Sequence, residues 1–166
     1  NRTISNFSGS GTSYTATFTP AADGACTIDV LQNAFTDVAT NGNTASDQFN
    51  WEYDGTAPTL SNVSLTSQNS SNDQYSTSYA KLGDTVTLTF TSSETIQTPT
   101  VTFTSGGSGI NNSITGPTAS GNNWTASYVV HNSDSDGAVG YTIEFSDTVG
   151  NEGVDVTSGA GSVTVD

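Results

Sequence analysis

The sequence predicts an all-β protein made of β-sandwiches, and three observations support this class. Apolar and polar residues alternate over many short runs, as in residues 85–90, TVTLTF, which is the pattern of half-buried strands. Turn-forming stretches such as residues 106–109, GGSG, separate these runs. No window shows the 3.6-residue period of an amphipathic helix. Together these features predict short antiparallel strands joined by turns.

The charge balance restricts the partners. Sixteen acidic residues against two basic ones give a net charge of −14 over 166 residues, which disfavours nucleic acids and anionic membrane surfaces and favours divalent cations. A second interpretation is that the acidity only maintains solubility. No apolar run is long enough to cross a bilayer. The single cysteine, Cys26, is expected to be a small buried apolar residue.

An internal repeat sets the domain organisation. Residues 1–18 match residues 111–128 at a constant offset of 110, and Asp23-Gly24-Ala25 matches Asp136-Gly137-Ala138. Residues 1–54 are therefore expected to be the second half of one repeat, and residues 55–166 a complete repeat. Four strands without a facing sheet would leave apolar residues wet, which predicts a longer tandem array. Completion by strands from another chain is the alternative.

The complete repeat divides into seven expected strands, which are residues 60–66, 85–91, 100–104, a short strand around Ile114, 124–130, 140–146 and 162–165. Seven short strands in about 110 residues predict an immunoglobulin-like sandwich. No pair of cysteines is available to link its sheets, so the core must be held by apolar packing. The residues expected to point inward are Val86, Leu88, Phe90, Val101, Phe103, Trp124, Ala126, Tyr128, Ile143 and Phe145.

Several motifs resemble a known family. The segments 7–20, FSGSGTSYTATFTP, and 35–41, FTDVATN, together with 83–90 and 145–151, are similar to the bacterial Ig-like repeats of very large secreted adhesins. The resemblance covers nearly the whole chain. It implies tandem β-sandwiches in a cell-surface stalk or extracellular fibre, rigidified by calcium. The chain departs from the family at Ala39-Thr40, where such repeats carry an alanine-glycine pair.

Acidic residues fall in loops and in the linker. Asp54 opens a joint, residues 54–59, DGTAPT, in which proline disfavours both helix and sheet pairing. The strand order of a sandwich places Glu94 and Asp147 in loops at the end next to this joint, and Asp23 reaches it from the preceding half repeat. Oxygen-rich clusters of this kind suit Ca²⁺. The same reasoning gathers Asp84, Asp134, Asp136 and Asp166 at the opposite end as a second site, and local amide capping by turn aspartates is the alternative.

These features predict a non-enzymatic, structural role. His131, the only histidine, has no base and nucleophile set around it, and no zinc or phosphate-binding spacing occurs. We expect an extracellular or cell-surface stalk or fibre module stiffened by calcium, whose partners are neighbouring repeats and other copies in a fibre. The alternative is a carbohydrate-binding module of a secreted enzyme, in which Trp51 or Trp124 would stack on sugar rings.

Overall fold

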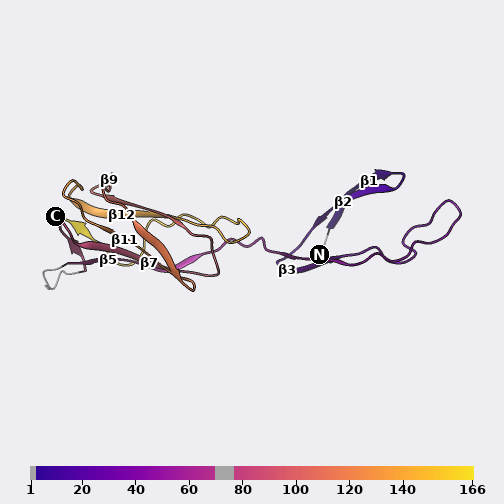
Figure 1. Cartoon of the computed structure of the whole chain (residues 1–166), viewed down its shortest axis with the longest axis horizontal. Helices are drawn as coiled ribbons and strands as arrows, with labels where there is room; N and C mark the ends of the chain where they lie inside the picture. Colours follow the sequence, from indigo (N-terminus) through magenta and orange to yellow (C-terminus); the bar gives the residue numbers. More distant parts are fainter. Residues whose placement is uncertain (1–2, 70–76) are drawn as a thin grey trace. The chain divides into compact units, whose positions relative to one another are not determined.

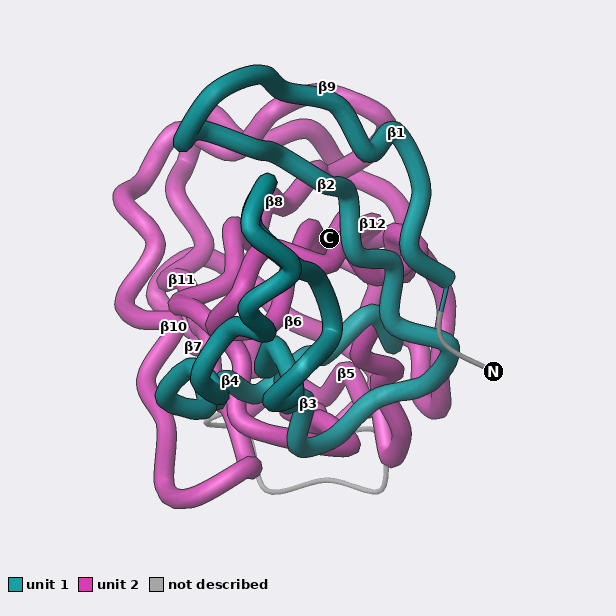
Figure 2. Tube along the Cα trace, turned by 90° about the vertical axis from the view of Figure 1, so that its right-hand side faces the viewer, with its two compact units in different colours: residues 1–56 teal, residues 57–166 magenta. Residues whose placement is uncertain are grey.

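The computed structural model describes residues 3–69 and 77–166, and the chain divides into two compact units (Figure 1). Unit 1 comprises residues 1–56 and unit 2 residues 57–166, coloured separately in Figure 2. All regular structure in the described residues is β-strand, so the predicted fold class is confirmed. No helix long and apolar enough to span a bilayer occurs in these ranges.

Unit 2 is a sandwich of two sheets. The first has the order β10-β11-β7-β5 and the second the order β6-β13-β12-β8-β9. The strands of the first sheet are β5 (Leu60–Gln68), β7 (Thr85–Ser92), β10 (Thr115–Ser120) and β11 (Asn123–Val129). Those of the second are β6 (Tyr79–Ala80), β8 (Thr100–Ser105), β9 (Ser108–Gly109), β12 (Gly137–Glu144) and β13 (Thr164–Val165).

The core of unit 2 forms where alternating side chains of the two sheets meet. Along β7, Val86, Leu88 and Phe90 are buried while the threonines of the strand are more exposed, because successive side chains of a strand point to opposite faces. The rings of Phe103 in one sheet and Tyr128 in the other lie 5.0 Å apart. All ten residues that the sequence predicts to point inward are buried, and they belong to one continuous core.

The predicted strands of unit 2 recur with shifted ends. The strand expected at 140–146 begins earlier, as β12 at Gly137, because Gly137 and Ala138 pair with β13. The prediction that residues 106–109 form only a turn is wrong at its end, since Ser108 and Gly109 pair back onto β8 as β9. Each of these differences involves only two residues, Gly137 and Ala138 in β12 and Ser108 and Gly109 in β9. A run of two residues has no periodicity that could be detected in the sequence.

Unit 1 contains two separate two-stranded sheets. The hairpin of β1 (Thr3–Ser10) and β2 (Ser13–Thr19) forms one, and β3 (Gly24–Ile28) with β4 (Phe49–Tyr53) forms the other. Cys26 is buried, as expected. Trp51 lies edge-on against Phe18, with ring centroids 5.1 Å apart. Most other apolar side chains of this unit, including Phe49, are exposed.

Candidate metal centre

Two loops of unit 2 bring Glu94 and Asp147 together. Glu94 follows the end of β7, and its carbonyl accepts a hydrogen bond of 2.6 Å from the Ser92 hydroxyl. Two residues later, Ile96 forms a β-bridge with Asp147. Gln97 strengthens this pairing, since its side-chain amide donates to the Asp147 carbonyl at 2.9 Å. The chain therefore runs past Asp147 immediately after Glu94. Gln97 was not among the candidate residues identified from the sequence.

A clasp of amides holds the Asp147 carboxylate. Its Oδ1 accepts backbone hydrogen bonds from Val149, Gly150 and Asn151 at 2.9, 2.6 and 2.8 Å. Its Oδ2 accepts one from the Asn151 side chain at 2.6 Å. Burial raises the pKa of Asp147, but these hydrogen bonds outweigh burial and hold the pKa below its ordinary value. The buried side chain, 1% exposed, therefore remains an anion.

The same clasp recurs in unit 1 around Asp37. Its Oδ1 accepts from the amides of Ala39 and Asn41, both at 2.9 Å, and its Oδ2 accepts from the Asn41 side chain at 3.0 Å. The flanking bridges, Thr36 with Gly42 and Ser146 with Glu152, also correspond at an offset of 110. The spacing Asp-x-x-x-Asn is thus a repeated structural element, and the sequence shows it in both copies.

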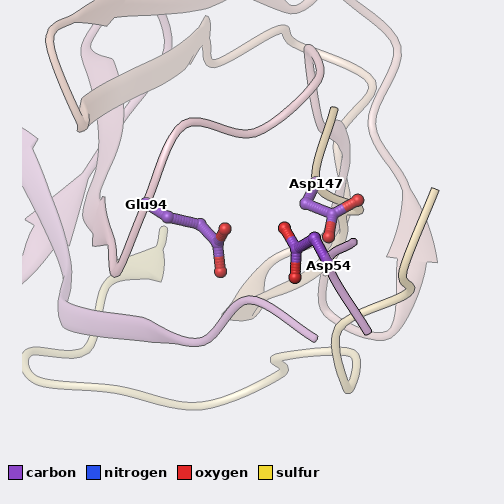
Figure 3. A group of neighbouring side chains, drawn as sticks. All are labelled: Asp54, Glu94 and Asp147. Atoms are coloured by element: carbon purple, nitrogen blue, oxygen red, sulfur yellow. The ribbon is translucent and has the colours of Figure 1, made fainter. Parts of the chain in front are cut away.

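Asp54 completes a group of three carboxylates. One oxygen from each of Asp54, Glu94 and Asp147 lies within 4.8 Å of the others (Figure 3). Asp54 sits in the linker, where its Oδ1 accepts a hydrogen bond of 3.1 Å from the Thr56 amide. The following linker residue Pro58 is fully buried, and Thr59 exchanges hydrogen bonds of 3.0 and 2.9 Å with Ser93. Thus the linker is anchored next to the loop that carries Glu94.

The composition of this group suits a hard cation. Two charges at such a separation repel by about 1 kcal/mol even with the dielectric constant of water. Lys81 is the one lysine or arginine in the described ranges, and its backbone amide donates to Asp84 just before the start of β7. Glu94 follows the other end of that eight-residue strand, about 26 Å away. The donor set contains only carboxylates, and Oδ2 of Asp147 keeps accepting capacity, so it fits the all-oxygen coordination of Ca²⁺.

Asp23 is not in this group, contrary to the expectation from sequence. Its two oxygens instead accept from the linker, Oδ1 from the Gly55 amide at 2.7 Å and Oδ2 from the Thr56 hydroxyl. The hydrogen bond from Thr56, followed by that from Gly55, lowers the pKa of Asp23. The physical reason is local: linker donors that follow directly after β4 satisfy the carboxylate. Asp23 therefore caps the linker.

The residues expected to form a second site are not gathered in the described part of the chain, where the single group of three potential ligands is the one containing Asp54. Asp134 is occupied by amides, accepting from Asn111 at 2.9 Å and from His131 at 2.8 Å. Burial raises the pKa of Asp134, but hydrogen bonds from the amides of His131 and Asn111 outweigh burial and hold the pKa below its ordinary value. Asp136 and Asp166 are exposed. Here the alternative of local amide capping describes Asp134.

His131 takes part in the same loop. Its Nδ1 shares a hydrogen bond of 2.7 Å with the Ser133 hydroxyl, while Asp134 contacts the backbone amide of His131. In a hydrolytic triad the carboxylate holds one ring nitrogen and the serine the other. The arrangement in this loop instead caps a turn.

The two facing sheets of unit 2, which are antiparallel except for the parallel pair of β6 and β13, define an immunoglobulin-like β-sandwich. Comparison with family models matches residues 1–53 to the bacterial Ig-like domain, which confirms the resemblance to bacterial Ig-like domains over these residues. Domains of this kind commonly occur in extracellular or surface proteins, and this indicates a surface or extracellular module. Comparisons with curated proteins and with solved structures found no match.

Proposed function

We propose that this chain is a structural, non-catalytic segment of an extracellular stalk or fibre, in which Ca²⁺ binds Asp54, Glu94 and Asp147. The observation that supports this proposal is the gathering of three carboxylates from three separate segments, with one ligand atom of each within 4.8 Å of the others. Two of these segments are joined through the Ile96–Asp147 bridge, and the third is the linker that carries Asp54.

Each residue has a defined part in the proposed site. Asp147 is a fixed anion, oriented by its amide clasp. Glu94 supplies a second carboxylate from the neighbouring loop, and Asp54 carries the third on the linker. Bound Ca²⁺ would supply positive charge that cancels their repulsion and ties the linker to unit 2. The linker would then resist bending, which is the property that a stalk needs.

The proposal is tested by thermal unfolding of the full chain with EDTA and with 10 mM CaCl₂. Extracellular modules bind Ca²⁺ with a Kd near 10⁻⁴ to 10⁻³ M, and a hundredfold excess over Kd stabilises by about 2.7 kcal/mol. We expect the Tm of unit 2 to rise by several degrees with Ca²⁺. Asp54→Asn combined with Glu94→Gln should abolish the rise. The control is Asp47→Asn with Glu144→Gln, which removes the same charge from exposed positions; an equal loss in this control would contradict the proposal.

One observation favours glycan binding as a second function. Phe7 and Tyr14 form an exposed, nearly parallel pair with centroids 5.6 Å apart, a geometry that sugar rings could stack on. However, Tyr14 is the counterpart of Trp124, which is buried in unit 2. In addition, a polar cavity of about 350 Å³ lies between Thr100 and Glu152. Among the described residues its single aromatic lining residue is Phe145, which is buried and so offers no exposed ring to a sugar. Binding to immobilised polysaccharide, lost in Tyr14→Ala, would support this function.

A further inference from the structure

Unit 1 repeats a defined portion of unit 2, pair by pair. In the β1–β2 hairpin the paired residues include Ser5 with Thr17 and Gly9 with Tyr14, with a register shift after Ser5. In the β10–β11 hairpin the equivalent pairs, each 110 residues later, are Thr115 with Ser127 and Ala119 with Trp124, with a shift after Thr115. The match extends to the clasp around Asp37. Unit 1 thus has the same local structure as the second half of unit 2.

The two copies differ in what pairs with their strand edges. In unit 2, β11 pairs with β7 along seven residues, and β12 pairs with β8 along six. In the described part of unit 1, β2 pairs with β1 and β3 pairs with β4, and their other edges carry no strand. Strand edges of this kind, with unpaired amides and carbonyls, are templates for another strand.

The exposed face of unit 1 has the chemistry of a sandwich core. Tyr14 is 57% exposed, whereas its counterpart Trp124 is 8% exposed beneath the facing sheet. Seven further large apolar side chains of unit 1 are exposed, namely Ile4, Phe7, Val30, Leu31, Phe35, Val38 and Phe49. Soluble proteins seldom expose large apolar groups together, as Phe7 and Tyr14 are exposed in their stacked pair, unless the surface binds a partner.

We infer that unit 1 binds the N-terminal half of an Ig-like repeat, a β-segment of the same chemistry as residues 60–105, through the open edges of β2 and β3. A strand like β7 would pair antiparallel with β2, and its apolar residues would cover Tyr14 and Phe18. A strand like β8 would pair with β3. The repeat identifies this partner, because in unit 2 it is β7 and β8 that pair with β11 and β12, the counterparts of β2 and β3. Bound strands supply main-chain hydrogen bonds as well as apolar burial.

The experiment uses the full chain with an added copy of residues 57–112 fused before Thr3. This fusion point reproduces the natural junction of residue 112 with Ser113, because Ser113 is the counterpart of Thr3 at the offset of 110. Amide hydrogen exchange of β2 and binding of the dye ANS are measured. We expect exchange of the β2 amides to slow by at least 100-fold and ANS fluorescence to fall by more than half. The matched control carries Leu88→Asp and Phe90→Asp in the added copy only, and it should restore both signals.

Two results would overturn the inference. The first is a β2 amide exchange rate in the fused chain that lies within threefold of the rate in the unfused chain, or a control variant that protects the β2 amides as strongly as the fused chain does. The second is protection of β2 in the unfused chain that increases with protein concentration, because the face would then be covered by a second copy of this chain. Unit 2 of the same molecule provides the internal standard, since its β11 amides should exchange equally slowly in every variant.

Discussion

The clasp residue before Asn41 or Asn151 has a left-handed backbone in both units, and this allows a reciprocal substitution test. Gly150 has a φ of 101°, and its counterpart Thr40 has a φ of 68°. For a β-branched residue this region is disfavoured, because Cβ approaches the following carbonyl, at a cost of about 1–3 kcal/mol. A Cβ placed on Gly150 would meet no atom within 4 Å. The Cβ of Gly150→Thr therefore meets no clash, and the substitution tests the strain of the left-handed backbone.

The expected magnitude follows from two opposing terms. The strain of about 1–3 kcal/mol is partly offset by the 0.5–1 kcal/mol of chain entropy that glycine loses on folding. Gly150→Thr should therefore destabilise unit 2 by about 1–2 kcal/mol, a fall of several degrees in Tm. Thr40→Gly should stabilise unit 1 by a similar amount.

The assay is thermal unfolding followed by tryptophan fluorescence in a Trp51→Phe background, where Trp124 reports on unit 2 alone. Gly109→Thr is the matched control, because Gly109 also has open space around its Cβ position but no left-handed φ. Strand propensity favours threonine at this position, so the Tm of Gly109→Thr should equal or exceed that of the parent chain. Equal Tm values for Gly150→Thr and Gly109→Thr would refute the strain argument.

Three further predictions concern the core and two titrating groups. Leu88→Ala should lower the unfolding free energy of unit 2 by about 2–5 kcal/mol in urea titrations, whereas Leu82→Ala at an exposed site should change it little. Burial, followed by the charge of Asp134, raises the pKa of Tyr128 to about 12, so its ionisation should cost unit 2 about 2–3 kcal/mol between pH 10 and pH 12. In alkaline melts Tyr128→Phe should remove this contribution and leave that of Tyr141, whose pKa burial also raises. The Asn41 side chain, then its amide, lowers the pKa of Asp37, so unit 1 should be destabilised as pH falls below about 4, and Asp37→Asn should flatten this acid limb in chemical denaturation.

Much of the fold could be predicted from alternation alone. The period of two in β7 and β11 identified which residues are buried, because a half-buried strand must place its apolar side chains on one face. β9 escaped prediction, since two residues cannot show a period. The repeat at an offset of 110 was visible in the sequence, but only the pairing registers show that the β-bulge of the hairpin recurs as well.

The candidate site was less predictable, because neighbours across loops depend on tertiary pairing. Glu94 lies near Asp147 through the bridge at Ile96, which has no sequence signature of its own. Asp23 does contact the linker, as the sequence suggested, but Gly55 and Thr56 donate to its oxygens there, and it is not in the group of three carboxylates. The spacing of Asp147 and Asn151, in contrast, is a local motif, and its amide clasp could have been inferred from the general capping preference of aspartate.

Isothermal titration of Ca²⁺ into the chelator-treated full chain tests the central claim most directly. If Asp54, Glu94 and Asp147 hold the ion, the titration should show about one ion per chain with a Kd of roughly 10⁻⁴ to 10⁻³ M. Asp54→Asn should weaken that binding at least tenfold, while Asp47→Asn should leave it unchanged. Absence of binding heat at millimolar Ca²⁺, or identical isotherms for the chain and its Asp54→Asn variant, would contradict the account.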